Sequence, residues 1–476
     1  MESSDRTGNR PVQWRADRRA ADPVRMVAYE VLQAVTQEEA YSNLVLPVVI
    51  REAELEGRDA GFATHLTYGT LRWQGFLDEV ISSASSRPLN EVDPHVLTLL
   101  RLGAFQMMFM RVPPHAAVAE TVQLTRVVAG ESRTKFVNAI MRRIGERSVD
   151  EWVALVSPKA SHDPVAHLSV AQSHPQWVVR ALAESLSAWR IKQGQPPATW
   201  VEVEDLLIAN NEPADVTLVA RPGRADAGEI ARRYNAEPGK YSPYAVSLGF
   251  GAPSELPEVR SGDVGVQDEG SQLVALAFTR AEVVGTDQLW LDMAAGPGGK
   301  AAILAGVGAE RGARLIAADQ SEHRAFLVAQ TLAGSPGSHL TVVADGREGP
   351  WQPDSFDRIL LDAPCTGLGV IRRRPESRWR RSTVDVGVLA GLQRELLGAA
   401  LAAVRVGGIV GYATCSPHLA ETELVVDDVC ERFNVERIDT RSLLPEVNDL
   451  GAGPDLRLWP HIHGTDGMYL ALLRRL

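Results

Sequence analysis

From Leu289 to the end of the chain, short apolar runs alternate with helical stretches, and this alternation constrains the fold more than any other feature. The clearest helical stretches between the runs are 300–310 and 389–404. Strands and helices that alternate in this way form an open, mostly parallel, doubly wound sheet. Five buried strands are predicted: QLWLDMAA (288–295), RLIAAD (314–319), LTVVAD (340–345), FDRILLDAP (356–364) and GGIVGYATCS (407–416). The last segment, 457–476, is predicted to add an antiparallel strand at the edge of this sheet.

The chain before this region predicts further parts of different character. Apolar residues recur at helical spacing from Pro23 to about Arg147, which indicates an all-helical domain. Short β-branched runs follow the Gly/Pro-containing stretch IKQGQPPAT (191–199), and they indicate a small α/β module. The predicted organisation is a disordered tail (1–22), a helical domain (23–150), a helical linker (151–200), a small α/β module (201–285) and the Rossmann-like α/β domain (286–476).

Composition limits the setting in which such a chain works. A hydrophobic fraction of 45% and a charged fraction of 23% are typical of a globular protein. The sequence shows neither an unbroken apolar run of about 18 residues nor a secretory signal, so we expect a cytoplasmic protein that does not use a membrane. The three cysteines do not form a disulfide framework and remain available for chemistry. We expect a monomer without a metal site.

A glycine-rich loop and three aspartates mark the predicted ligand site. In a doubly wound sheet, ligands bind beyond the carboxyl ends of the strands. The first strand runs into DMAAGPGGK (292–300), and Asp319, Asp345 and Asp362 close the next three. An adenosine cofactor without a pyrophosphate needs such carboxylates, although aspartates in this position also cap helices. The predicted cofactor-binding residues are Ala294, Ala295, Gly296, Pro297, Gly298, Gly299, Lys300, Asp319, Asp345 and Asp362.

Two of the three cysteines lie at the ends of predicted strands. Cys365 lies in LLDAPCTGLG (360–369) and Cys415 in YATCSPH (412–418), whereas Cys430 belongs to an amphipathic helix and receives no function. A buried, inert thiol is the usual alternative for any cysteine. Lys300 follows the glycine loop in a chain with only five lysines and 44 arginines, and it is either functional or a solvated first-turn lysine.

A basic segment follows Cys365 closely, although the net charge of the chain is −11. VIRRRPESRWRR (370–381) contains six arginines, one glutamate and one tryptophan. A solvated loop and a phosphate-binding strip are both compatible with this composition. Its position beside Cys365 favours the strip, so Arg372, Arg373, Arg374 and Arg378 are predicted to contact the phosphates of a nucleic acid, and Trp379 is a candidate for stacking on an exposed base.

Three ordered motifs, 292–300, 362–379 and 412–423, together resemble the Fmu/Sun family of S-adenosylmethionine-dependent RNA 5-methylcytosine methyltransferases. VQDEGSQ (266–272) and DGMYLALLRR (466–475) add to the resemblance. LTYGTLRW (66–73), RVPPHAAVAETV (111–122) and KFVNAIMRRI (135–144) resemble the NusB-like RNA-binding domain of the bacterial members that modify small-subunit ribosomal RNA.

The resemblance implies a covalent reaction on cytosine. C5 of cytosine is a poor nucleophile until a thiolate adds at C6, and the thiolate must later leave. By resemblance Cys415 attacks C6, Cys365 assists release, and Asp362 steadies the ring. Lys300 contacts the cofactor carboxylate or polarises the base. The implied cofactor is S-adenosylmethionine, and the implied partner is 16S ribosomal RNA or an assembling small subunit.

Two other functions remain open at this point. The chain could be a non-catalytic RNA-binding assembly factor on a methyltransferase scaffold, which the presence of both cysteines, Lys300 and the loop argues against. The glycine loop alone also suggests a nicotinamide-dependent dehydrogenase. That alternative leaves both cysteines and the helical domain without a role.

Overall fold

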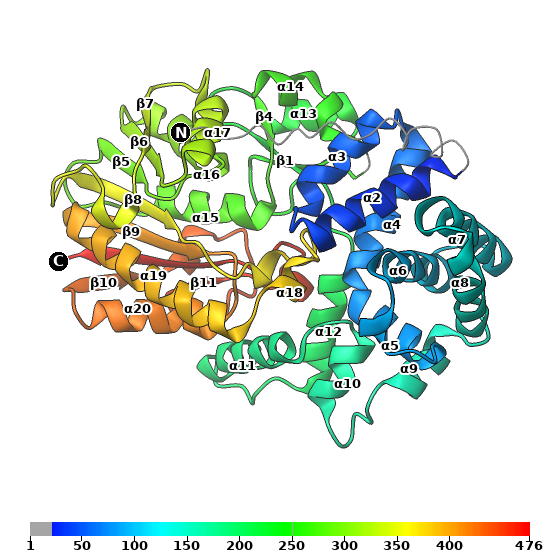
Figure 1. Cartoon of the computed structure of the whole chain (residues 1–476). Helices are drawn as coiled ribbons and strands as arrows, with labels where there is room; N and C mark the ends of the chain where they lie inside the picture. The colour runs from blue at the N-terminus through cyan, green and yellow to red at the C-terminus, as the bar shows by residue number, and fades with distance from the viewer. Residues whose placement is uncertain (1–20, 250) are drawn as a thin grey trace, which may run out of the picture. The chain divides into compact units, whose positions relative to one another are not determined.

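The computed structural model describes residues 21–249 and 251–476, which fall into two compact units (Figure 1). Unit 1 holds the described residues through Gln176 together with Arg374–Trp379, and unit 2 holds Trp177–Arg373 and Arg380–Leu476. Residues 1–20 of the predicted disordered tail lie outside the described residues. Asp22 already has a structural role, because its side chain accepts the backbone N–H of Arg25 and caps the first described helix.

Unit 1 is helical throughout its described residues. Its helices pack closely: a Cβ built on Gly69 would lie 1.9 Å from the ring of Phe105, so this helix crossing requires glycine. Ser148 and Glu151 form a reciprocal capping box at the start of a later helix. The elements are α2 (Pro23–Gln37), α3 (Ser42–Glu52), α4 (Gly57–Arg72), α5 (Gln74–Ala84), η2 (Leu89–Glu91), α6 (Pro94–Phe109), α7 (Pro114–Ala129), α8 (Glu131–Ile144), α9 (Val149–Val156), α10 (Pro164–Ala171) and the short α18 (Ser377–Arg380).

Unit 2 is built on a large mixed sheet with the order β10-β12-β9-β8-β5-β6-β7, and β11 pairs with β12. Five adjacent strands, from β9 to the edge strand β7, are parallel to one another, whereas β12 runs antiparallel to β9 and β10. The strands are β5 (Leu289–Asp292), β6 (Arg314–Asp319), β7 (Ser338–Val343), β8 (Phe356–Asp362), β9 (Val404–Thr414), β10 (Val435–Ile438), β11 (Leu456–Arg457) and β12 (Tyr469–Arg475).

Helices cover both faces of this sheet (Figure 1). Alternate strand residues point to opposite faces, so Leu360 packs with α15, α16 and α17, whereas Ile359 and Leu361 pack with α19 and α20. Burial on both faces explains why these strands read as continuous apolar runs. The helices are α15 (Glu269–Arg280), α16 (Gly299–Glu310), α17 (Glu322–Leu332), α19 (Thr383–Ala403) and α20 (Glu423–Cys430).

A second, antiparallel sheet with the order β2-β3-β1-β4 precedes the large one in the chain, and helix α13 packs against it. The region also contains α11 and α12, and the latter begins with a capping box of Thr199 and Glu202. The elements are α11 (Gln176–Lys192), α12 (Trp200–Asn211), β1 (Thr217–Ala220), α13 (Ala227–Tyr234), β2 (Glu237–Pro238), β3 (Ala245–Ser247), η3 (Pro253–Glu255), α14 (Pro257–Ser261) and β4 (Val264–Val266). The remaining short helices are η4 (Gly346–Glu348), η5 (Leu368–Val370), η6 (Leu419–Glu421), η7 (Thr440–Leu443) and α21 (Pro460–His463).

The predicted fold class is confirmed, with an all-helical N-terminal part and a doubly wound α/β C-terminal part. Two details of the predicted sheet were wrong. The C-terminal strand β12 lies between β9 and β10 rather than at the edge, because the short, half-buried β10 pairs with its outer side. The third parallel strand begins at Ser338 and ends at Val343, two residues before Asp345.

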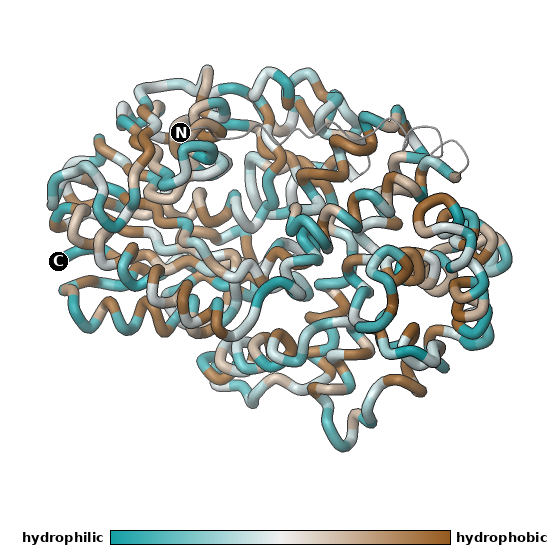
Figure 2. Tube along the Cα trace, viewed as in Figure 1, coloured by the Kyte–Doolittle hydropathy of each residue, from teal (hydrophilic) through white to brown (hydrophobic). Residues whose placement is uncertain are grey.

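Two helices illustrate how the layers are held. Helix α20 alternates between hydrophilic and hydrophobic colours along its length in Figure 2, and its buried residues are Val425, Val426 and Val429. Helix α19 is, among the described residues, the one helix that is long and apolar enough to cross a bilayer by composition. Its buried apolar residues, such as Leu397 and Leu401, instead pack with the sheet and α20, whereas Val384 and Val388 near its start are exposed, so one face of the helix belongs to the core of unit 2.

Candidate active site

The carboxyl ends of β5 and β8 form the point where the strand order of the sheet reverses. Strands β6 and β7 extend from β5 on one side, and β8 and β9 extend on the other. The register pairs Asp292 of β5 with Leu360, and Asp362 of β8 with Ala413 of β9. Because these strands are parallel, the residues that follow them gather at one edge of the sheet, where ligands bind in this architecture.

The two strand-end cysteines meet at this edge. Cys415 directly follows β9, Cys365 follows β8 by three residues, and their Sγ atoms lie 3.3 Å apart. Both are free thiols and partly buried. The hydrogen bond with Cys415 and then burial raise the pKa of the Cys365 thiol well above its ordinary value. Cys365 is therefore held in its protonated form at neutral pH.

The buried Lys300 and the partly exposed Asp362 form an ion pair at the same edge. The Nζ atom of Lys300, in the first turn of α16, lies 2.8 Å from Oδ2 of Asp362. Burial alone would lower the pKa of Lys300, but the negative charge and hydrogen bond of Asp362 outweigh it and hold the pKa above the usual value. Lys300 therefore stays cationic at neutral pH, and a negative charge on Cys415 would favour this further.

Asp292 lies beneath this pair and was not singled out from the sequence. It is 1% exposed at the end of β5. Burial, followed by repulsion from Asp362, raises its pKa to about 8. Asp292 thus holds its proton at neutral pH beside Asp362. Its position directly before the glycine loop was the signal that could have identified it.

The loop from Ala294 to Gly299 is held tightly over the ends of β5 and β6. The N–H of Gly296 donates to Asp319 Oδ2 at 3.0 Å, and the N–H of Ala295 donates to the carbonyl oxygen of Ala318 at 2.8 Å. A Cβ on Gly296 would lie 2.4 Å from Oδ2 of Asp319, and Gly298 has a φ of +110°. Both glycines are therefore required by the backbone path, which leads into the N-terminus of α16.

The other two strand-end aspartates differ in exposure. Asp319 has a side chain that is only 4% exposed, and besides Gly296 it accepts the N–H of Ser321. In this structure it shapes the glycine loop. Asp345 lies beyond β7 as the cap of η4, is 36% exposed at its side chain, and forms an ion pair with Arg347. The hydrogen bonds from Arg347 hold the pKa of Asp345 below its ordinary value.

The first arginines of the basic segment are engaged with acidic residues of unit 2. Arg373 pairs with Asp268 at 2.7 Å and with Asp466 at 2.9 Å, and Arg372 lies 3.2 Å from Asp466. Both aspartates are nearly buried, and burial with repulsion from Asp268 raises the pKa of Asp466 to about 7. These two arginines thus tie the segment after Cys365 to the motifs at 266–272 and 466–475.

The later residues of the segment pack within unit 1. Arg378 is fully buried and donates to the carbonyl oxygen of Ser173 at 3.1 Å, and burial lowers its pKa to about 9. The Trp379 ring lies so close to Gly75 that a Cβ there would be 2.3 Å from it. The prediction of an RNA contact is therefore wrong for Arg378, and the Trp379 ring packs on α5 in this structure. Arg374 is the exposed arginine among the five predicted RNA contacts.

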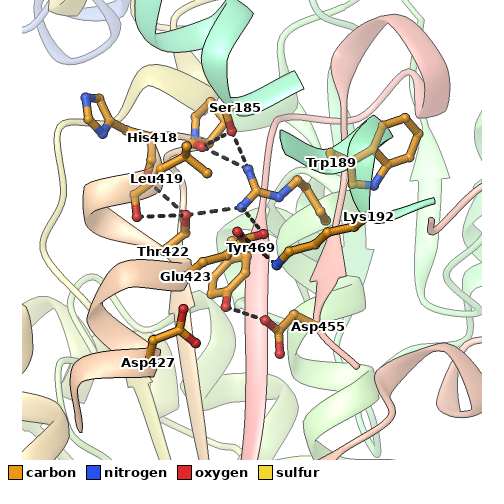
Figure 3. Close-up of polar contacts among 12 residues, drawn as sticks. Ser185, Trp189, Lys192, His418, Leu419, Thr422, Glu423, Asp427, Asp455 and Tyr469 are labelled. Carbon is orange, nitrogen blue, oxygen red and sulfur yellow. Dashed lines mark hydrogen bonds and ion pairs between the residues drawn. The ribbon is translucent and has the colours of Figure 1, made fainter. Parts of the chain in front are cut away.

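The turn after Cys415 is anchored by a polar network that was also not anticipated. Figure 3 shows Ser185 of α11, Thr422 and Glu423 pointing toward one another. The buried Arg457 donates to the carbonyl oxygen of Pro417 at 2.9 Å, to Thr422 Oγ1 at 3.1 Å, and lies 3.2 Å from Glu423. Ser185 also donates to the Pro417 carbonyl oxygen. These two donors thus hold the backbone of Pro417, two residues after Cys415, in place.

Comparison with known families gives two matches along the chain. Residues 283–474 match the family model described as 16S rRNA methyltransferase RsmB/F. Residues 22–146 match the NusB family. The first range contains the large sheet and both strand-end cysteines, and the second contains the helices α2 to α8.

Curated relatives match over nearly their whole length. A Mycobacterium tuberculosis protein, provisionally named as a methyltransferase, is 49% identical over 96% of this chain and 98% of its own. The probable ribosomal RNA small subunit methyltransferase B of Bacillus subtilis is 31% identical over 95% of this chain and 98% of its own. The ribosomal RNA small subunit methyltransferase B of Pseudomonas syringae is 32% identical over 94% and 96%.

Solved structures support the fold. The protein PH0851 has a TM-score of 0.75 at 20% identity, covering 95% of this chain and 99% of that chain. NSun6 from Pyrococcus horikoshii, solved with SFG, has a TM-score of 0.50 at 19% identity, covering 61% of this chain and 98% of that chain.

Proposed function

Since this chain belongs to the 16S rRNA methyltransferase RsmB/F family, we propose that it transfers a methyl group from S-adenosylmethionine to C5 of a cytosine in 16S ribosomal RNA through a covalent cysteine adduct. The proposal places the enzyme in the cytoplasm as a monomer. Its substrate is the naked RNA or the RNA of an assembling small subunit.

The observation that carries the chemistry is the pair of free thiols whose Sγ atoms lie 3.3 Å apart. Methylation of C5 requires addition of a nucleophile to C6 and its later departure. One thiol suffices for the addition, and a second beside it serves the departure. Neither a dehydrogenase nor a scaffold protein needs this arrangement.

The residues at the glycine loop fit S-adenosylmethionine. Glycine is required at Gly296 and Gly298, the loop leads into the N-terminus of α16, and carboxylates follow β6 and β7. The residues that would hold the cofactor are Ala294, Ala295, Gly296, Pro297, Gly298, Gly299, Lys300, Asp319, Asp345 and Asp362. When bound, the cofactor supplies an electrophilic methyl group.

Cys415 is proposed as the attacking nucleophile. Its Sγ forms a bond to C6 of the cytosine, and the electrons of the C5–C6 double bond become available at C5. Asp362 steadies the ring by accepting a hydrogen bond from its N4 amino group, and from N3 once that nitrogen is protonated. Lys300, kept cationic by Asp362, stabilises negative charge that develops on the base.

Cys365 is proposed to assist release. Once C5 carries the methyl group, a general base takes the C5 proton, the electrons of that C–H bond re-form the C5–C6 double bond, and Cys415 leaves C6 as a thiolate. Cys365 is held protonated beside Cys415 in the resting enzyme, which keeps it from competing for C6.

RNA recognition is proposed to use the NusB-family part and Arg374. Arg372 and Arg373 are engaged with Asp466 and Asp268, so we assign them to holding the segment in place. A paired cytosine would have to leave its helix to reach the cysteines.

The proposal is tested by bisulfite sequencing of ribosomal and transfer RNA from cells with and without the gene. We expect the loss of one 5-methylcytosine in 16S ribosomal RNA. An unchanged methylation pattern in both RNA classes would contradict the proposed activity.

A further inference from the structure

Glu421 joins the two loops that carry the cysteines. It is fully buried at the end of η6. Its Oε1 accepts the backbone N–H of Thr366 at 2.7 Å, and its Oε2 accepts the hydroxyl group of Ser416 at 2.6 Å. Thr366 directly follows Cys365, and Ser416 directly follows Cys415. One carboxylate therefore binds the neighbours of both sulfurs.

The hydrogen bonds to Glu421 all come from neutral groups. The Thr366 hydroxyl donates to Oε2 at 2.5 Å, and Nε2 of Gln393 lies 3.4 Å from Oε1. The same Nε2 atom donates to the carbonyl oxygen of Pro364 at 2.8 Å, just before Cys365. Several directed donors are needed to keep a buried carboxylate in place. Glu421 is thus the centre of a small network that spans both loops.

The two loops differ in how they are held. Arg457 and Ser185 fix the turn after Cys415 from behind, through the carbonyl oxygen of Pro417. Glu421 belongs to this anchored turn, and it reaches across to the loop of Cys365. The carboxylate of Glu421 therefore fixes the position of the Cys365 loop relative to Cys415.

We propose that Glu421 is a positioning residue that holds Cys365 at the distance from Cys415 that release requires; this rests on the covalent mechanism proposed above. Attack on C6 needs Cys415 alone, whereas release needs Cys365 beside the same base. Loss of the Glu421 contacts should therefore slow release more than attack. A residue that only stabilised the fold would slow both steps together and would not accumulate the adduct.

The test follows the covalent adduct between the enzyme and labelled 16S ribosomal RNA transcribed in vitro. Glu421→Asp shortens the side chain by one methylene and cannot span both loops, and Thr366→Val removes one hydroxyl donor on the Cys365 side. With S-adenosylmethionine present, we expect both variants to leave at least about tenfold more shifted RNA on a denaturing gel than the wild type. Glu421→Gln keeps the length of the side chain and one acceptor oxygen. The amount of shifted RNA that it leaves should lie between that of these two variants and that of the wild type.

Two controls separate the possible outcomes. Glu269→Gln alters another buried glutamate that accepts two backbone N–H groups, from Tyr241 and Ser242, and should leave the adduct at the wild-type level. Cys365→Ala should trap the adduct. If it does and none of the Glu421 and Thr366 variants accumulates adduct, the role of Glu421 is overturned. If Cys365→Ala and Cys415→Ala are both active without any adduct, the covalent mechanism itself fails.

Discussion

The ammonium group of Lys300 donates a 2.8 Å hydrogen bond to the carboxylate of Asp362, and the side chain of Lys300 is only 10% exposed. The pair joins the first turn of α16 to the end of β8, on either side of the switch point of the sheet. A cation fixed in this way stands at the place where the proposed reaction needs to stabilise developing negative charge.

Replacement of Lys300 tests this assignment. Lys300→Met removes the charge, and we expect methyl transfer to fall by at least about 100-fold, the usual scale for a positioned charged group. Stability should fall by about 1.5 kcal/mol, because Asp362, whose side chain is 32% exposed, loses a charge-assisted hydrogen bond but stays partly solvated. Single-turnover methylation and urea unfolding measure the two effects, with the exposed Lys240→Met as the control. Unchanged turnover would remove Lys300 from the chemistry.

Asp292 should make stability depend on pH. Its folded pKa of about 8 lies above the unfolded value of about 4, so between these values only the folded state holds the proton. This contribution to stability is complete below about pH 4 and is lost as the pH rises to 8, by up to about 1.4 kcal/mol per pH unit. The stability of Asp292→Asn relative to wild type should thus increase from pH 6 to 8 and then level off. A difference that does not vary with pH would contradict this.

Asp319 should govern cofactor affinity through the loop. It holds the N–H of Gly296, and a charge-assisted contact of this kind contributes about 1.5 to 3 kcal/mol. Calorimetry should therefore show S-adenosylmethionine binding weakened by roughly tenfold to a hundredfold in Asp319→Ala. Asp226→Ala, which removes the cap of α13, serves as the matched control. Equal affinities in both variants would place Asp319 outside the cofactor site.

The parallel core of the sheet could be predicted because its strands are buried on both faces and read as unbroken apolar runs. Strand β10 escaped prediction since its four residues, VERI, are only half buried and carry two charges. Its absence from the prediction also misplaced β12 at the edge. Hydrophobic periodicity and apolar composition identify strands whose side chains are buried. A short strand at the edge of a sheet buries little, so neither its periodicity nor its composition identifies it.

Some residues of the candidate site could likewise be identified from the sequence, whereas others could not. The cysteines and the aspartates could be identified because they lie at the ends of predicted strands, and Lys300 because it follows the glycine loop in a chain with few lysines. Glu421 lies within the motif 412–423, but neither it nor Arg457 closes a predicted strand, and their contacts appear only when distant segments meet. The contacts of the basic segment were predicted on the assumption that charged side chains are exposed. In the structure Arg378 is buried and Arg373 pairs with two aspartates.

Arg373 and Arg374 should therefore behave differently on substitution. Arg373→Met breaks contacts to the nearly buried Asp268 and Asp466, and we expect a loss of about 3 kcal/mol in the free energy of unfolding. Arg374→Ala should change stability by less than about 0.5 kcal/mol but lower the log–log salt slope of RNA binding by roughly one phosphate contact. Filter binding at several salt concentrations gives the slope. An unchanged slope would show that Arg374 makes no phosphate contact.

The most direct test of the covalent mechanism is a denaturing gel of labelled 16S ribosomal RNA after incubation with S-adenosylmethionine and each cysteine variant. Cys365→Ala should methylate once and stall, leaving a persistent shifted band, because elimination follows methyl transfer and can be slowed separately. Cys415→Ala and the double variant should give no band and no methyl transfer. The reverse pattern would exchange the roles of the two cysteines, and full activity without an adduct in both single variants would contradict the covalent mechanism.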